Sequence, residues 1–430
     1  MNSNGNIQKT EIGTFPADWQ IQKLGDLVQN GRTIRYGVVQ PGAFVSDGCI
    51  MLRSQDYSKG WADPASAYRI SNAIANQYRN AQLKENDLIL TVVGANTGQV
   101  AVAPRWLDGA VLSRSTSRIA IDVDRVDSRF CKFIIQSPTV QRQILDNLKE
   151  GAQPVISCQD VADFLVPVPP KEEQRAIAEA LSDVDALINA LDALITKKRH
   201  IKQGTMQQLL TGKKRLPGFE LTKEFKQTEV GVVPKDWTAN ALRAFIKLQG
   251  GYAFRSSNFS TSGVPVIRIS DIQSGFASVS ECTCHPEFAI PAEFIVEKND
   301  VLIAMSGATT GKIGVFKHEK NAYQNQRVGR FVIRNNDETS QSFVSHLVAS
   351  KLFLIQLGVY LEQGAQPNIS GSQIESLEFA FPPRTEQIAI AEVLSDMDAE
   401  ITALEQKRDK TKLIKQGMMQ ELLTGKTRLI

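Results

Sequence analysis

The sequence predicts a mixed α/β protein in which two globular domains are joined by two long helices. We expect these helices to pair as an antiparallel coiled coil with internal pseudo-two-fold symmetry. Three observations lead to this fold. The 430-residue chain repeats itself once, each copy ends in a helical segment with a narrow apolar seam, and each copy begins with short apolar runs between Gly-rich turns.

The repeat is long and chemically varied. The segment GAQPVIS at 151–157 returns as GAQPNIS at 364–370, and this offset of 213 residues continues to the C-terminus. The opening TEIGTFPADW at 10–19 returns as TEVGVVPKDW at 228–237. Between these shared ends the copies diverge. The unit is far longer than a solenoid repeat of roughly 20–50 residues, so two copies of one module make up the chain.

The diverged part of each copy reads as a mixed α/β domain. Turn clusters GANTG at 94–98 and GATTG at 307–311 separate apolar runs, and we interpret both as structural hairpins or binding loops. GATTGKI is not a phosphate-binding loop, because its glycine spacing is wrong and Ile313 stands where Ser or Thr must bind magnesium. We expect strands at 88–93, 100–103, 264–269, 301–305 and 330–333, and helices at 130–148 and 342–361.

The shared part of each copy is a helix that follows a Pro-Pro pair, at 169–170 and at 382–383. Proline is tolerated in the first turn of a helix but not further inside. Apolar residues then recur at alternating spacings of 4 and 3, until Arg408 interrupts the pattern of the second copy. The predicted seam consists of Ile177, Leu181, Val184, Ile188, Leu191 and Ile195 in the first copy, and Ile390, Leu394, Met397, Ile401 and Leu404 in the second.

Neither helix can bury this seam alone, and the other copy is the economical partner. Antiparallel pairing is expected, because a two-fold axis across the coil places the globular domains at opposite ends. In the alternative, each helix packs on its own globular domain. The seam is narrow and long rather than wide, which favours the coil.

The end of the first helix is basic. Two interpretations stay open, a solvated face that favours the negative end of the helix dipole, and a contact with an acidic protein or DNA phosphate. The basic residues are Lys197, Lys198, Arg199, Lys202, Lys213, Lys214 and Arg215.

No motif for catalysis or metal binding stands out. Cys282-x-Cys284-His285 lacks a second ligand pair, and none of the four histidines lies beside a nucleophile and an acid. Five scattered cysteines favour a reducing cytoplasm over a disulfide framework. The formal net charge is only +3, so any nucleic-acid surface must be local. We expect no membrane association, because no apolar stretch approaches the ~20 residues of a membrane span.

The duplicated module resembles the DNA specificity (S) subunit of Type I restriction-modification systems. The residues that carry the resemblance are the openings at 10–19 and 228–237, PPKEEQRAIAEALSDVDALI facing PPRTEQIAIAEVLSDMDAEI, and the IKQG…LLTGK runs near the helix ends. The resemblance implies two target recognition domains, at 1–160 and 216–373, and two spacer helices, at 161–215 and 374–430.

The family's known activity implies a non-catalytic chain in which each domain reads one half of a split, asymmetric sequence of double-stranded DNA. The expected partners are two modification subunits and motor-nuclease restriction subunits. S-adenosylmethionine, ATP and Mg²⁺ would act on those partners, and no cofactor or metal is expected on this chain. Alternatives are a self-contained DNA-modifying enzyme with an unrecognised site, and a coiled-coil scaffold that does not bind DNA.

Candidate DNA contacts come from composition alone, because Arg and Gln make bidentate contacts to guanine and adenine edges. Two pairs correspond across the repeat, Arg53 and Asp56 with Arg268 and Asp271. The candidates are Arg32, Arg35, Tyr36, Arg53, Arg114 and Arg118 in the first domain, and Tyr252, Arg255, Arg268, Gln326 and Arg327 in the second.

Overall fold

The computed structural model divides the chain into two compact units. Unit 1 comprises Met1–Asp192 with Gln406–Ile430, and unit 2 comprises Ala193–Glu405. Each unit therefore combines one globular segment with parts of both long helices. Residues 151–153 of GAQPVIS and residues 364–367 of GAQPNIS lie outside the described part of the chain. The described residues are 7–58, 60–149, 154–220, 224–280, 282–286, 290–361 and 368–429.

Unit 1 is built around two sheets. A four-stranded antiparallel sheet has the order β4 (Arg35–Tyr36), β10 (Thr116–Ile119), β7 (Leu88–Thr91), β8 (Val100–Val102). A three-stranded sheet has the order β6 (Arg69–Ile70), β5 (Cys49–Leu52), β9 (Val111–Leu112), and its β5–β9 pair is parallel. The remaining elements are the pairs β1 (Ile7–Thr10) with β2 (Gly13–Pro16) and β3 (Gln20–Lys23) with β11 (Leu165–Val168), and helices α1 (Asn72–Gln77), α2 (Ser128–Gln136), α3 (Pro138–Asp146) and α4 (Cys158–Asp163).

Unit 2 has the same two-sheet plan, with more strands in each sheet. The larger sheet has the order β15 (Ile246–Gly250), β24 (Val328–Ile333), β21 (Val301–Ala304), β22 (Ile313–Phe316), β18 (Gly275–Ala277), β17 (Ile272–Gln273). The smaller has the order β19 (Cys284–His285), β16 (Val264–Ile267), β23 (Ala322–Gln324), β20 (Ile295–Val296), with β16–β23 parallel. The remaining elements are the pairs β12 (Phe225–Thr228) with β13 (Gly231–Pro234) and β14 (Thr238–Ala241) with β25 (Glu378–Phe381), and helices α6 (Gln341–Val348), α7 (Lys351–Leu361) and α8 (Gly371–Glu375).

The predicted mixed α/β architecture is confirmed. GANTG joins β7 to β8, and GATTG joins β21 to β22, each pair antiparallel, so both turns are hairpins as expected. The helix predicted at 130–148 is instead two helices, α2 and α3, and the helix predicted at 342–361 is α6 and α7. In unit 1 the break falls at Pro138, which has no N–H to donate and disfavours a helical Ser137. In unit 2 the Ser350 hydroxyl accepts a bond from the Phe353 N–H (3.4 Å), as a helix cap does.

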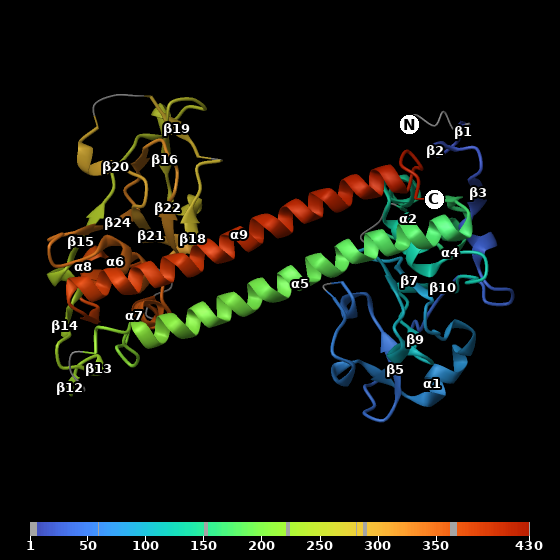
Figure 1. Cartoon of the computed structure of the whole chain (residues 1–430), viewed down its shortest axis with the longest axis horizontal. Coiled ribbons are helices and arrows are strands. Elements are labelled where there is room, and N and C mark those ends of the chain that lie inside the picture. Colours follow the sequence, from blue (N-terminus) through green and yellow to red (C-terminus); the bar gives the residue numbers. More distant parts are fainter. Residues whose placement is uncertain are drawn as a thin grey trace. The chain divides into compact units, whose positions relative to one another are not determined.

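Two long helices, α5 (Lys171–Leu209) and α9 (Arg384–Leu422), have 39 residues each and are unbroken (Figure 1). Both begin directly after the predicted Pro-Pro pairs. The first turns of each helix are buried in the core of their own unit, α5 through Ile177 and Leu181, α9 through Ile390 and Leu394. The start of each long helix therefore packs on its own globular domain, which is the alternative weighed from the sequence.

The end of the opposite helix completes each core. In unit 1, Leu422 and Leu423 from the end of α9 join the cluster that contains Ile177. In unit 2, Leu209 and Leu210 from the end of α5 join the cluster that contains Ile390. These residues correspond across the repeat. Each unit is therefore built from both copies of the sequence.

The helical segments within unit 1 run antiparallel. Two ion pairs connect α5 with α9, Asp185 with Lys415 at 2.6 Å and Asp192 with Arg408 at 3.3 Å. A third joins Glu173 of α5 to Arg428, which lies beyond the end of α9, at 2.6 Å. Residue numbers rise along α5 as those of the paired residues fall along α9, so the two segments are antiparallel. The predicted interruption at Arg408 is a half-buried position filled by this ion pair with Asp192.

Candidate functional site

Three backbone segments of unit 1 meet where the parallel strands β5 and β9 end. The Ser113 N–H donates to the Leu52 carbonyl (2.9 Å), and the Val38 N–H donates to the Leu112 carbonyl (2.6 Å). Residues 36–38, 52–53 and 112–114 therefore lie side by side, and we call them edge 1. Because parallel strands end on the same side, the side chains that follow them share one surface.

Unit 2 contains the same arrangement. The Asn325 N–H donates to the Ile267 carbonyl (3.1 Å), and the Tyr252 N–H donates to the Gln324 carbonyl (2.8 Å). We call residues 251–252, 267–268 and 324–327 edge 2. These two hydrogen bonds match the two named for edge 1, although the sequences of these segments have diverged.

A glycine allows each edge to close. A Cβ atom on Gly37 would lie 1.7 Å from the Leu112 carbonyl oxygen, and one on Gly251 would lie 2.0 Å from the Asn325 carbonyl oxygen. Both distances are far below van der Waals contact, so neither position accepts a side chain without moving the backbone. The two glycines occupy equivalent places, which the sequence alignment of the copies did not show.

The corresponding pairs Arg53–Asp56 and Arg268–Asp271 form the same local structure. After each strand the chain makes a short 3₁₀ turn, η2 (Ser54–Asp56) or η8 (Ile269–Asp271), in which the aspartate accepts from the arginine N–H at 2.8 or 2.9 Å. The same carboxylates pair with the guanidinium groups, at 2.8 Å for Arg53 and 3.6 Å for Arg268. Each edge thus carries one arginine beside an aspartate.

Most other predicted DNA contacts cluster around these edges. Tyr36 is 53% exposed and Tyr252 37% exposed, and the Tyr252 ring packs on Phe254 and Phe294 at centroid distances of 5.0 and 5.5 Å. The exposed polar candidates are Arg114 at edge 1 and Gln326 and Arg327 at edge 2, with Arg35 directly before edge 1 and Arg255 in the loop after Tyr252. Contact between these side chains and DNA stays a prediction.

Two candidates lie inside unit 1 instead. Arg118 is 2% exposed and donates to the carbonyls of Gln82 (3.0 Å) and Thr33 (3.1 Å). Burial, together with the nearby Arg32 cation, lowers the pKa of the Arg118 guanidinium to about 10. Arg32 itself makes a two-pronged ion pair with Asp87, at 2.6 and 2.9 Å. Both groups are committed to the core, and we assign them a structural role.

Sequence reasoning missed the role of the parallel strand pairs in bringing the candidates together. It also counted Arg118 as a surface residue because composition does not report burial. In the structure, Arg118 lies within a run of buried strand residues, Thr116–Ile119. An arginine inside such a run points into the protein or along the sheet rather than to solvent.

The basic end of α5 is largely used within unit 2. Lys198 pairs with Glu400 and Lys202 with Asp398, both at 2.6 Å, and Arg199 pairs with Glu405. These acidic residues all lie on α9. The arrangement favours an internal role for most of this charge over a phosphate contact.

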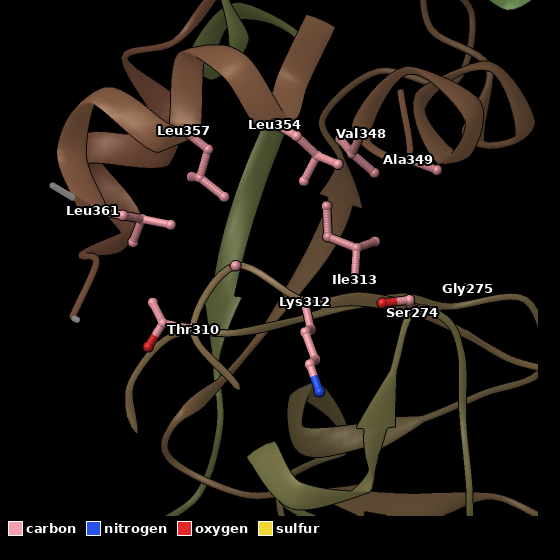
Figure 2. A pocket seen from close by; sticks show the side chains of 11 residues that line it. Ser274, Gly275, Thr310, Lys312, Ile313, Val348, Ala349, Leu354, Leu357 and Leu361 are labelled. Carbon is pink, nitrogen blue, oxygen red and sulfur yellow. The ribbon is translucent and has the colours of Figure 1, made fainter. Parts of the chain in front are cut away.

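A cavity of about 470 Å³ opens in unit 2 between α7 and the hairpin that carries GATTG. Figure 2 shows Leu354, Leu357 and Leu361 of α7 facing Ile313, with Lys312 at the margin. The equivalent hollow in unit 1 is lined by polar residues such as Gln99 and Gln141. Neither hollow brings a nucleophile, base and acid together among the residues described.

The described ranges of the chain contain no group of three or more His, Cys, Asp or Glu side chains placed to hold a metal ion. His285 of the predicted weak cluster is buried, and its ring packs on Phe254 at 5.0 Å. Within the same ranges no single helix is long and apolar enough to span a membrane, although the bent pair α6–α7 passes on length and composition.

Comparison with known proteins identifies the family. The model of the Type I restriction modification DNA specificity domain matches twice, at residues 16–202 and 234–413, which is most of the chain. The chain belongs to this family. Its two matched regions correspond to the two copies of the internal repeat, each with one edge.

Relatives named as specificity subunits align along the chain. The Type I restriction enzyme MjaVIII specificity subunit of Methanocaldococcus jannaschii is 25% identical, covering 96% of this chain and 94% of the relative. The EcoBI specificity subunit of Escherichia coli is 26% identical over 56% of this chain and 51% of its own length. The Type I S subunit from M. genitalium has a similar structure, with a TM-score of 0.59, 15% identity and 98% of both chains covered. That last likeness shows a shared fold.

Membership of the Type I specificity family confirms the resemblance seen in the sequence. The protein is a DNA-recognition specificity subunit. This role contradicts the alternative of a scaffold that does not bind DNA.

Proposed function

We propose that each unit reads one half of a bipartite, asymmetric target in double-stranded DNA, through edge 1 and edge 2. The observation that carries this proposal is the match of the two edges in backbone and their difference in side chains. Exposed Arg, Gln and Tyr residues follow the parallel strands, and such groups bond to base edges and phosphates. Equal scaffolds with unequal side chains suit two half-sites of different sequence.

The helices α5 and α9 form, in this proposal, one antiparallel coiled coil that sets the distance between the half-sites. The ion pairs between the helices within each unit support it. At about 1.5 Å per residue, a 39-residue helix is roughly 58 Å long. Half-sites about one DNA turn apart, ~34–36 Å, fall within that span. The buried positions Ile188, Leu191 and Ile195 of α5 and Ile401 of α9 would form the central seam.

Two modification subunits are the proposed partners, each docking on one of the two equivalent helical surfaces. The near-identity of the repeated helices supports this, because two copies of one partner need the same surface twice. The chain itself is proposed to be non-catalytic. S-adenosylmethionine would act on the modification subunits, and ATP and Mg²⁺ on motor-nuclease subunits.

The spacer role is tested by lengthening both helices. Seven residues, one heptad, are inserted after Leu191 and after Leu404, which keeps the seam in phase. The insertion adds roughly 10 Å, so the unread gap should grow by up to about three base pairs while both half-sites stay the same. Mapping of methylated adenines in cells that express the variant with its modification subunit reads out gap and half-sites together. Altered half-sites would contradict the proposal that the edges read the bases while the helices set only the gap.

A further inference from the structure

The two edges allow a comparison within one chain. Positions that carry the same residue in both units serve what the two half-sites share, whereas positions that differ are suited to what distinguishes them. Arg53 and Arg268 belong to the first kind, because each is held by an aspartate three residues later. A guanidinium beside such an aspartate presents the same group at both edges.

A hydrogen-bonded turn at each edge provides a position of the second kind. In unit 1 the Thr116 N–H donates to the Ser113 carbonyl (3.2 Å), and in unit 2 the Val328 N–H donates to the Asn325 carbonyl (2.9 Å). Both turns follow the second strand of a parallel pair. The residue after Ser113 is Arg114, and the residue after Asn325 is Gln326.

Further backbone bonds fix the two turns in the same orientation. The next carbonyl along, of Ser115 or of Arg327, accepts a bond from the strand that precedes the Gly-rich hairpin, at 2.9 Å from the Val92 N–H and 3.0 Å from the Met305 N–H. Arg114 and Gln326 are therefore displayed by matching scaffolds. Both are exposed, and neither side chain has a hydrogen-bond or ion-pair partner among the described residues.

The chemistry of these two side chains differs in a way that base edges distinguish. A guanidinium can donate two hydrogen bonds to N7 and O6 of guanine, whereas a carboxamide donates to N7 and accepts from N6 of adenine. Each such pair discriminates against a wrong base by roughly 5- to 150-fold. Equivalent placement with different donor sets is what two unlike half-sites require.

We propose that Arg114 and Gln326 are specificity-determining residues at equivalent places of the two edges. Arg114 contacts a guanine in one half-site, and Gln326 contacts an adenine in the other. This inference rests on the proposed reading of one half-site by each unit and adds the residues that separate the two readings.

The test uses the full chain in complex with its modification subunits. The target is first mapped as the methylated sequence of the wild-type complex, and 30-base-pair duplexes carrying it are then varied one base pair at a time in binding measurements. Gln326→Arg should change the preferred base at one position from adenine to guanine in one half-site only, by roughly 5- to 150-fold. Arg114→Gln should make the reverse change in the other half-site. Arg142→Gln, on the exposed face of α3, is the control and should leave every preference unchanged.

Alanine variants cover the case in which a new side chain is not accommodated. Arg114→Ala and Gln326→Ala should each abolish discrimination at one base pair while the remaining positions keep their ranking. A fall in affinity that is equal for all duplexes would mean a phosphate contact and would overturn the inference. An unchanged ranking in all four variants would overturn it as well. A wild-type complex without two separate half-sites would instead contradict the proposed function, and the two failures are thus distinguishable.

Discussion

Arg428 and Glu173, 255 positions apart, form a two-pronged ion pair with bonds of 2.6 and 2.8 Å. Arg428 also bonds to Asp18, and its guanidinium lies 5.9 Å from the Trp19 ring. The bonds to Glu173 and Asp18 raise the pKa of Arg428. The last residues of the second copy thereby hold the first residues of the first copy.

The same constellation recurs in unit 2. Arg215 pairs with Glu386 at 2.6 Å and with Asp236 at 2.9 Å, and it lies 5.9 Å from the Trp237 ring. All four residues correspond across the repeat. The last residues of each copy, around Arg215 and Arg428, therefore bind residues of the other copy. The two copies exchange equivalent C-terminal segments in this way.

Arg215→Ala should destabilise unit 2 by about 3–5 kcal/mol, since it leaves the buried Glu386 carboxylate without its ion-pair partner. Arg428→Ala should cost less, because the Arg428 side chain is 25% exposed against 7% for Arg215, and water can replace part of the lost interaction. Hydrogen exchange measured by mass spectrometry reports on each unit separately. It should show faster exchange at the start of α9 in Arg215→Ala and at the start of α5 in Arg428→Ala. Lys235→Ala, which breaks only the exposed pair with Glu224, is the control. Equal protection in both arginine variants and the control would contradict this account.

Residues 1–217 expressed alone should form a homodimer. This fragment contains Arg215 and the counterparts of its partners, Glu173 and Asp18, so two copies can make the exchange that the full chain makes within itself. Sedimentation equilibrium at micromolar concentration measures the expected dimer. Arg215→Ala in the fragment should shift it toward monomer, and a wild-type fragment that is monomeric throughout would speak against the exchange.

His346 should make unit 2 sensitive to acid. The ring bonds to Ser395 at 3.1 Å, and burial, together with the Lys202 cation, lowers the pKa of His346 to about 4. Below pH 6.5 the unfolded chain binds a proton that the folded unit does not, so stability should fall between pH 6.5 and about 4, by ~3 kcal/mol in total. Asp398 faces the same ring and opposes this effect in part.

The first copy supplies the matched variant for this test. Phe133 occupies the place of His346 in unit 1, with Lys415 at 5.3 Å from its ring. His346→Phe should therefore flatten the pH dependence of urea unfolding between pH 7.5 and 5. The same substitution at the exposed His318 serves as the control. A slope that is unchanged in His346→Phe would show that other groups cause the acid sensitivity.

Gly37→Ala and Gly251→Ala should disrupt the edges without altering any polar group. The new methyl groups would overlap the carbonyl oxygens of Leu112 and Asn325, and overpacking of this kind costs about 1–3 kcal/mol or more. Each variant should weaken binding at one half-site. Gly204→Ala, near the end of α5, meets no atom within 4 Å and should instead be neutral or stabilising by up to about 1 kcal/mol. Wild-type affinity in both edge variants, measured on target duplexes, would show that these segments do not face DNA.

Much of this fold could be predicted because it is duplicated. The Pro-Pro pairs fixed where α5 and α9 begin, and the Gly-rich turns marked the two hairpins. The exchange around Arg428 was also visible in principle, since the shared PADW/PKDW openings and the shared helix ends contain every residue of it. What the sequence lacks is a sign that these two shared segments touch.

The candidate site was harder to predict for a physical reason. Its geometry comes from backbone hydrogen bonds between strands far apart in the chain, and these bonds place few demands on side chains. Gly37 and Gly251 lie in segments that have otherwise diverged, so their equivalence emerges only from the bonds to Leu112 and Gln324. Arg118 and Arg114 have the same composition signal, and only burial separates the structural residue from the exposed one.

The central claim is that each unit reads its own half-site. Mapping of N6-methyladenine across a genome, in cells that express the chain with its modification subunit, tests it most directly. The account predicts one split, asymmetric sequence with two defined halves and an unread gap of constant length. A continuous palindrome, or methylation without a second half-site, would contradict it.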